Sequence, residues 1–215
     1  MFTKHWFRWT VWIAALAGVL LIAGLALAAP ATHTSTNVFT HPSQGPVQQV
    51  QGASATLVTT DEGASFVLNT SELNPGHAYT VWFLAINNPA ACATTPCTAA
   101  DVLFNTAAVQ ADITYGAGHV VGKSGVGNFA GSVAVGELPG AWFGNGFTNP
   151  RGAEIHLVLN DHGPVIADLV SNMISTYRGG CTDASLPPPF PATAKADGIP
   201  GPNACRLFQF AIFQQ

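Results

Sequence analysis

Short runs of β-branched and aromatic residues, each ended by Gly, Pro or Asn, constrain this chain more than any other feature. HAYTVWFLAIN at 77–87 is the strongest of them and predicts a central strand buried on both faces. In AEIHLVLND at 153–161, every second residue from 155 to 159 is Ile or Leu, which is the alternation expected of a strand whose two faces differ. Further segments bring the predicted strands to about seven: 53–60, 64–73, 109–121, 126–138 and 206–213.

These strands follow one another with few helices between them, and only 8% of the residues are charged, against about 25% in an average protein. The sequence therefore predicts an all-β fold, an immunoglobulin-like or Greek-key antiparallel β-sandwich with disulfide-stapled loops. One short helix is expected within 165–177, where apolar residues recur at helical spacing: Ile166, Leu169, Val170, Met173 and Ile174. A single helical turn is expected at 98–105.

The amino terminus has the pattern of a signal peptide. Lys4 and Arg8 precede an uncharged run over 11–29, and Ala26-Leu27-Ala28 supplies the small residues that a signal peptidase requires. We predict cleavage after Ala28, with an uncleaved membrane anchor as the alternative. Residues 29–50, rich in Thr, Ser, Pro and Gln, are expected to be a flexible lead-in, and 51–215 a single β-sandwich domain that is secreted, periplasmic or on the cell surface.

Charge and motifs exclude two classes of partner. Removing residues 1–28 takes away Lys4 and Arg8 but no acid, which leaves five basic and 11 acidic side chains and disfavours nucleic acid. Ala117 followed by Gly122-Lys123-Ser124 matches a loose phosphate-binding loop, but the residues after it, GVGNFAGSVAVG, are strand-like instead of helical. We therefore expect a turn here and no nucleotide.

All four cysteines lie in the part of the chain predicted to be exported, and an even count in an oxidising compartment indicates two disulfides. Three pairings are possible. Cys92–Cys97 and Cys181–Cys205 are the predicted pairs, because they close the shortest loops. The alternative is a metal–thiolate site, which the spacing of the cysteines does not match.

Four histidines of the predicted domain are candidate metal ligands: His77, His119, His156 and His162. Alternation places Glu154, His156 and Asn160 on one face of the strand at 153–161, and neutral imidazoles with a carboxylate suit copper or zinc. The other interpretation gives these side chains structural hydrogen bonds and the protein no cofactor.

The loop AWFGNGFTNP is the candidate ligand-binding segment, through Trp142, Phe143 and Phe147, whereas Trp82 is expected in the core. No catalytic residue is predicted, since no serine lies in a Gly-x-Ser-x-Gly elbow.

PGHAYTVWFLAINNPAAC, then GHVVG and RGAEIHLVLNDHGP, resemble a set of uncharacterised exported bacterial proteins with the same order of motifs, over residues 50–213. More loosely, strand-borne histidines with Gly-rich hairpins are similar to chordin-type CHRD domains and to copper/zinc superoxide dismutase sandwiches. Their closely spaced histidine cluster is missing here. The resemblance implies a β-sandwich and no activity.

The first functional interpretation is an exported binding or structural module whose partner is a small ligand or a cell-envelope component. A histidine-based copper or zinc protein is the alternative, and a secreted hydrolase the second alternative. Contact with a membrane is expected only if the signal segment stays uncleaved.

Overall fold

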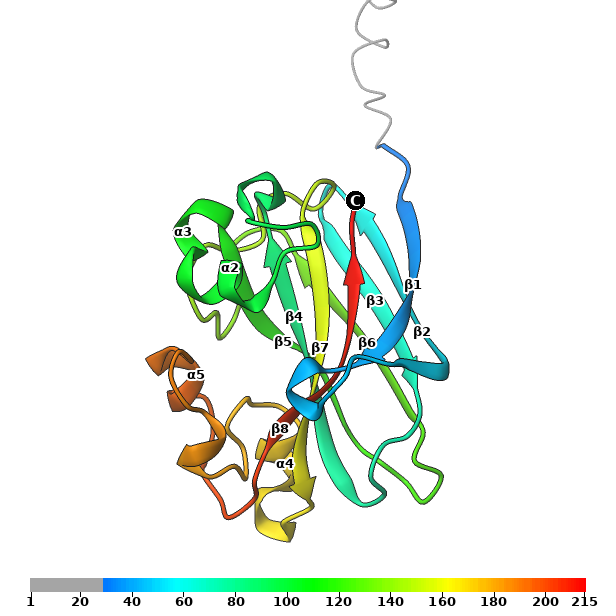
Figure 1. The fold of residues 1–215 in the computed structure, drawn as a ribbon, viewed down its shortest axis with the longest axis vertical. Helices are drawn as coiled ribbons and strands as arrows, with labels where there is room; N and C mark the ends of the chain where they lie inside the picture. Colours follow the sequence, from blue (N-terminus) through cyan, green and yellow to red (C-terminus); the bar gives the residue numbers. More distant parts are fainter. Residues whose placement is uncertain (1–28) are drawn as a thin grey trace, which may run out of the picture. The chain divides into compact units, whose positions relative to one another are not determined.

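The computed structural model describes residues 29–215, and the predicted signal peptide lies outside them. Eight antiparallel strands form one sheet (Figure 1) in the order β5-β4-β7-β8-β1-β2-β3-β6. The prediction of an antiparallel all-β fold is confirmed. The strands are β1 (Thr32–Thr40), β2 (Gln49–Thr60), β3 (Gly63–Thr70), β4 (His77–Ile86), β5 (Ala111–Val120), β6 (Gly127–Ala134), β7 (Glu154–Pro164) and β8 (Arg206–Phe213).

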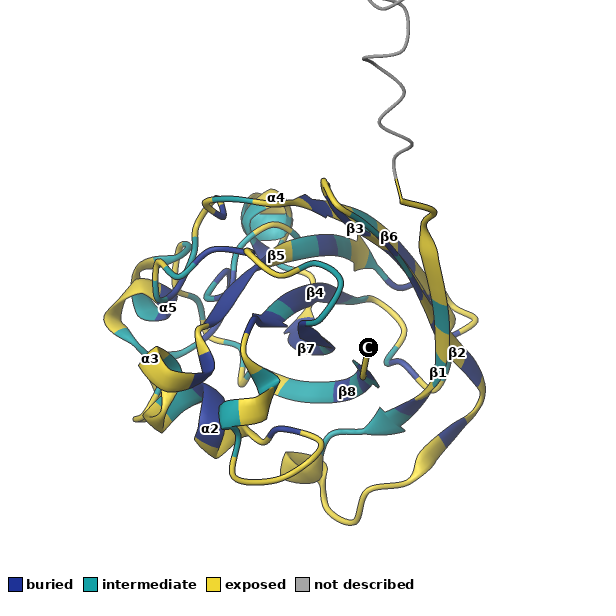
Figure 2. Ribbon diagram, turned by 90° about the horizontal axis from the view of Figure 1, so that it is seen from above, coloured by how far each residue is buried: buried dark blue, intermediate teal, exposed yellow. Residues whose placement is uncertain are grey.

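The sheet curls until its two edge strands, β5 and β6, approach each other (Figure 2). Two glycines make this approach possible. A Cβ atom on Gly131 of β6 would lie 2.4 Å from the carbonyl oxygen of Gly116 on β5, a distance that no side chain tolerates. The result is a nearly closed, barrel-like sheet with an inner and an outer face.

The predicted alternation of β7 is confirmed, because its two faces belong to different cores. Ile155, Leu157 and Leu159 are fully buried inside the curled sheet. Val158 and His156 lie on the outer face, where a second apolar cluster forms around Trp82 of β4. β4 is buried along nearly its whole length, as predicted, and lies between β5 and β7, but it is second from the edge of the sheet and not at its centre.

Four short helices lie beside the sheet (Figure 1): α2 (Ala99–Phe104), α3 (Thr106–Val109), α4 (Val170–Met173) and α5 (Ala192–Ala196). Of these, α2, α3 and α5 each contribute a buried residue to the outer cluster. The helix predicted within 165–177 is present as a 3-10 turn, η3 (Ala167–Leu169), that runs into the single turn of α4. The helical turn predicted at 98–105 is α2. The Pro-rich segment between Cys181 and Cys205 carries α5.

The flexible lead-in predicted at 29–50 is wrong. Its residues 32–40 form β1, which pairs with β2 along its length and with β8 at Phe39 and Thr40. The segment looks like a linker because it is polar, and Val38 is the one residue of β1 that is buried. Thr is β-branched, however, and suits a strand that is largely exposed to solvent. The compact unit therefore begins at Ala31 instead of Gln51.

Both predicted disulfides are present, Cys92–Cys97 and Cys181–Cys205, each with Cα atoms 5.4 Å apart. The turn predicted at 122–125 leads into strand β6, not into a helix, so it lacks the strand–loop–helix form of a phosphate-binding loop. None of the helices formed by residues 29–215 has the length and hydropathy that crossing a membrane requires.

Candidate functional site: a cavity on the outer face of the sheet

A cavity of about 310 Å³ lies on the outer face of the sheet, and we refer to it as the outer-face cavity. Strand register builds its floor. Leu84 of β4 pairs with His156 of β7, which pairs with Ile212 of β8. The next row on the same face, two residues along each strand, consists of Trp82, Val158 and Phe210. Each strand thus contributes its outward-facing side chains to two adjoining rows.

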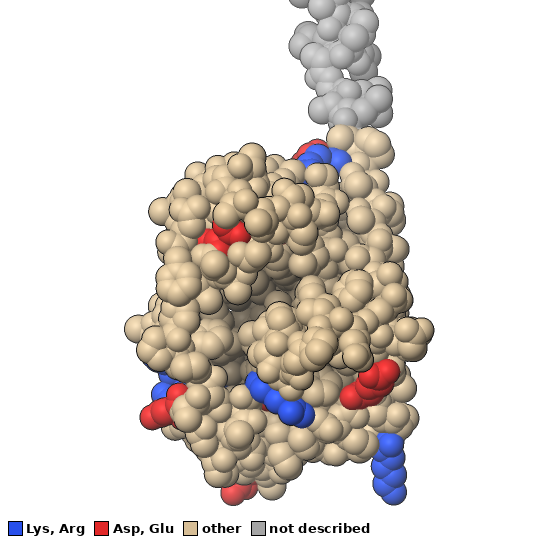
Figure 3. All heavy atoms as spheres, viewed as in Figure 1, with Lys and Arg blue, Asp and Glu red and all other residues tan. Residues whose placement is uncertain are grey.

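The walls come from segments far apart in the sequence. Helix α2 supplies Ala99, Val102 and Leu103, the loop after β6 supplies Trp142, and the segments around the second disulfide supply Tyr177 and Phe190. His41 and Pro42 complete the lining at η1 (Pro42–Gln44). Figure 3 shows a hollow on this face whose surroundings carry few charged side chains. No Lys, Arg, Asp or Glu is among the lining residues that the structure describes.

Four aromatic side chains pack against one another in this wall: Trp82, Trp142, Tyr177 and Phe190. The ring centroids of Trp142 and Tyr177 are 4.5 Å apart and those of Trp82 and Tyr177 are 4.8 Å apart, both in edge-to-face geometry. Such pairs add about 0.5–1.5 kcal/mol each beyond the area they bury. Burial raises the pKa of Tyr177, so its hydroxyl stays neutral.

The loop that carries Trp142 is held in place by a buried carboxylate. Asp112 of β5 is fully buried and accepts hydrogen bonds from the backbone N–H groups of Phe143 (3.0 Å) and Gly146 (2.7 Å). Asn87 holds the other side of the loop, donating to the Gly146 carbonyl at 2.9 Å and accepting from the Thr148 N–H at 2.8 Å. The aromatic wall is therefore pre-formed.

Trp142 itself carries an unsatisfied donor. Its side chain is 6% exposed, and Nε1 is the one fully buried side-chain nitrogen or oxygen without a hydrogen-bond partner in the described part of the chain. An unpaired buried donor costs about 1–3 kcal/mol.

The polar group of the cavity floor is His156, which Glu154 orients. Nε2 of His156 lies 2.6 Å from Oε1 of Glu154, which also accepts a hydrogen bond from the N–H of Cys97 at 2.8 Å. Burial acts to raise the pKa of Glu154, but the hydrogen bonds that its carboxylate accepts from His156 and from the N–H of Cys97 outweigh it and lower that pKa. The carboxylate is therefore ionised. The same-face placement predicted for Glu154 and His156 is confirmed.

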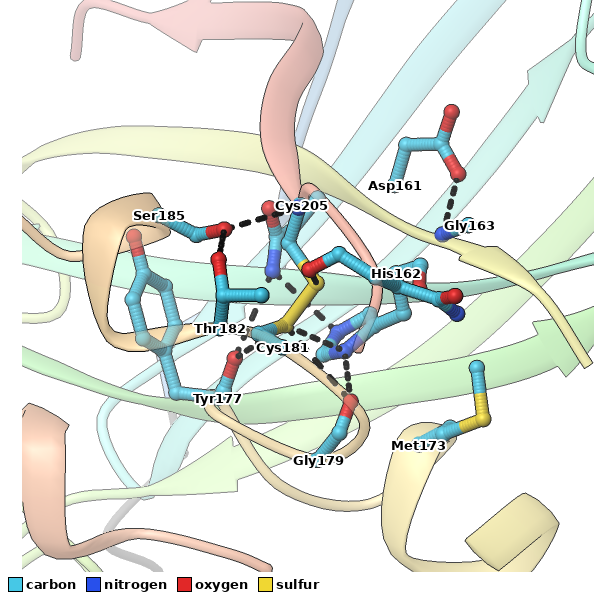
Figure 4. The surroundings of a disulfide bond; sticks show 12 residues. Asp161, His162, Gly163, Met173, Tyr177, Gly179, Cys181, Thr182, Ser185 and Cys205 are labelled. Atoms are coloured by element: carbon cyan, nitrogen blue, oxygen red, sulfur yellow. Dashed lines mark hydrogen bonds between the residues drawn. A yellow bond between two sulfur atoms is a disulfide. The ribbon is translucent and has the colours of Figure 1, made fainter. Parts of the chain in front are cut away.

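His162 is buried in a structural network (Figure 4), not at the cavity. Its Nδ1 lies 2.8 Å from the Gly179 carbonyl oxygen and its Nε2 lies 2.7 Å from Oγ1 of Thr80, which accepts from the indole N–H of Trp82. Burial lowers the pKa of His162 to about 4, so the ring is neutral near pH 7. Nδ1 carries the proton, because a carbonyl oxygen can only accept.

The remaining two candidate histidines lie elsewhere. His77, at the start of β4, contacts Asp161 with Nδ1 2.9 Å from Oδ1, and His119 on β5 is exposed beside Phe129. The register explains the separation. His156 pairs with Leu84, seven residues along β4 from His77, or roughly 23 Å at about 3.3 Å per residue.

The expected convergence of His77, His119, His156 and His162 is therefore not observed among residues 29–215. The one cluster there that brings three candidate ligand atoms within 4.8 Å of one another is His162, Cys181 and Cys205. Its two sulfur atoms are bonded to each other in the disulfide and are not free thiolates, which are the form that binds metal.

The predicted ligand-binding loop divides between the two cores. Trp142 lines the cavity, and Phe143 packs beside it without lining it. Phe147 is fully buried inside the curled sheet, edge-to-face against Phe83 at 5.5 Å, so a role in ligand contact is wrong for Phe147. Tyr177 and Phe190 were not predicted from the sequence. Phe190 lies in the Pro-rich segment that Cys181–Cys205 closes and Tyr177 shortly before it, so aromatic residues near this disulfide were the available signal.

Comparison with known proteins adds no relative: no family model, no curated protein and no solved structure matches this chain.

Proposed function

We propose that this domain binds a small, largely apolar molecule in the outer-face cavity. The observation that carries the proposal is a partly open hollow of about 310 Å³ with aromatic and aliphatic walls and the imidazole of His156, oriented by Glu154, in its floor. Ligand sites are typically apolar cavities of about 300–1,000 Å³ with a few placed polar groups. A purely structural module gains nothing from an unfilled hollow, since voids cost stability.

Rigid construction of the walls supports the same proposal. The Trp142 loop is fixed by Asp112, the base of α2 by the Cys92–Cys97 disulfide, and the Tyr177 segment by Cys181–Cys205. A site that is ordered before the ligand arrives loses less entropy on binding.

We also propose that the protein acts outside the cytoplasm, as the signal-peptide pattern predicts. The two disulfides support this, because such bonds persist in oxidising compartments. Amino-terminal sequencing of the protein recovered from its native cells tests it: a mature terminus at Ala29 is expected, and intact protein in the cytoplasm would contradict it.

The binding proposal is tested with N-phenyl-1-naphthylamine, a probe whose fluorescence rises in apolar sites. We expect saturable binding to the wild-type protein. Leu103→Trp fills the cavity from α2 and should weaken binding at least tenfold. Phe104→Trp is the matched control: Phe104 follows on the same helix but is 75% exposed, and the cavity lining does not include it. Equal binding by both variants, or no saturable binding by the wild type, would contradict the proposal.

A further inference from the structure

We infer that the ligand carries a hydroxyl group, as a phenol or an alcohol, which donates a hydrogen bond to Nδ1 of His156. This inference rests on the proposed function, because it names the chemical class of the molecule that the outer-face cavity takes. It follows from the hydrogen bond between His156 and Glu154, from the access of the second imidazole nitrogen to the cavity, and from the surrounding walls.

The Glu154 carboxylate fixes which nitrogen carries the proton. An ionised carboxylate can only accept, and Oε1 lies 2.6 Å from Nε2 of His156, so Nε2 is the donor. In a neutral imidazole the other nitrogen, Nδ1, is then unprotonated and accepts hydrogen bonds. Two further contacts hold the carboxylate in this position, from the Cys97 N–H at 2.8 Å and from the Gln214 amide at 3.4 Å.

Nδ1 of His156 makes no hydrogen bond within residues 29–215. Among these residues, the one fully buried side-chain nitrogen or oxygen without a partner is Nε1 of Trp142. Because Nδ1 of His156 also lacks a partner, it is not fully buried. Nδ1 therefore keeps access to the cavity that His156 lines. A nearly buried acceptor in a largely apolar hollow selects a ligand that can donate to it, because leaving it unpaired costs free energy.

The walls favour a neutral donor over a charged group. No Lys, Arg, Asp or Glu of residues 29–215 lines the cavity, so an anionic ligand would lose its hydration without gaining a permanent cation, and Glu154 stands directly behind His156. An ammonium ligand would need open aromatic faces. Here the aromatic rings of the wall pack against one another, with the centroids of Trp142 and Tyr177 4.5 Å apart and those of Trp82 and Tyr177 4.8 Å apart. A hydroxyl on an aromatic or aliphatic body meets both conditions.

A matched pair of ligands tests the inference on the unaltered protein. 2-Naphthol and 2-methoxynaphthalene have the same ring system, but only naphthol can donate a hydrogen bond. In competition with N-phenyl-1-naphthylamine at pH 8, we expect naphthol to bind at least tenfold more tightly. His156→Phe should abolish that preference while 2-methoxynaphthalene binds within threefold of its wild-type affinity. If His156→Phe fails to fold with Glu154 left unpaired, the double variant Glu154→Gln/His156→Phe replaces it.

The outcomes separate this inference from the proposed function. Equal binding of both compounds, each lost in Leu103→Trp, overturns the hydroxyl inference and leaves the binding site standing. Failure of both compounds and of the probe to bind overturns both. Tighter binding of 2-naphthoate or of 2-naphthylmethylammonium than of naphthol also overturns the inference. Nitrogen-15 NMR gives a readout that needs no ligand: a protonated Nδ1 in His156 of the free protein would contradict the assignment.

Discussion

Trp142 and Tyr177 lie edge-to-face with ring centroids 4.5 Å apart, although 34 intervening residues and the whole of β7 separate them in the sequence. Trp142 is positioned by the carboxylate of Asp112, and Tyr177 by the segment that the Cys181–Cys205 disulfide closes. The wall of the cavity therefore depends on two independent supports, and each can be removed separately.

Replacing Cys181 and Cys205 by alanine should lower the free energy of unfolding by about 3 kcal/mol, because this bridge closes a loop with a sequence separation of 24 residues. The matched change at Cys92 and Cys97, with a separation of five, should cost less. Urea denaturation measures both. Probe binding should also weaken in the first variant, as Tyr177 and Phe190 lose their support. A larger loss of stability from the shorter loop would contradict this account.

Asp112→Asn should destabilise the protein by about 2 kcal/mol and weaken probe binding, because an amide nitrogen cannot accept a hydrogen bond and would face a backbone N–H. Asp168→Asn, at an exposed position, is the matched control and should change stability by less than about 0.5 kcal/mol. Thermal unfolding and fluorescence titration of the two variants decide the matter. Similar stability in both would show that Asp112 does not hold the loop.

His162 should make the protein sensitive to acid. Its pKa is lowered from 6.5 to about 4 in the folded protein, so the unfolded chain takes up the proton first. Its contribution is fully present above about pH 6.5 and is lost as the pH falls toward about 4, by up to about 3 kcal/mol. Burial also lowers the pKa of His41 to about 4, so protonation of His41 reduces stability in the same direction.

Urea denaturation between pH 7.5 and pH 4 checks this acid sensitivity. His162→Gln should be less stable than wild type at pH 7.5 and should lose less stability on acidification. His119→Gln, at an exposed position, should keep the wild-type pH dependence. An unchanged slope in His162→Gln would refute the assignment of a neutral buried imidazole.

Gly131→Ala should destabilise the seam between β5 and β6 by at least about 1–3 kcal/mol, because the added Cβ would lie 2.4 Å from the Gly116 carbonyl oxygen. Gly122→Ala is the control, since a Cβ there meets nothing within 4 Å. A seam that tolerates alanine would mean that β5 and β6 do not approach each other in solution.

The sequence predicted those features that depend on local pattern. The two faces of β7 follow from alternation, and the paired cysteines from loop length. β1 was missed because its threonines and serines look like a linker, and pairing with β2 and β8 is not visible in composition. Tertiary context overrode the local signal there.

The candidate site could be predicted only in part. His156, Glu154 and Trp142 were identified from the sequence, but their chemistry depends on register and on loop packing. Once Leu84 is known to pair with His156, it is clear that His77 lies too far along β4 to share a metal with it. The walls formed by Tyr177 and Phe190 required the fold of the disulfide-closed segment, which no short motif encodes.

The most direct measurement is a set of intermolecular nuclear Overhauser effects between 2-naphthol and the methyl groups of the protein. Our account predicts contacts to Val158 in the floor and Leu103 in the wall of the outer-face cavity. Contacts confined to exposed valines such as Val67 and Val126, with none to Val158 or Leu103, would contradict it.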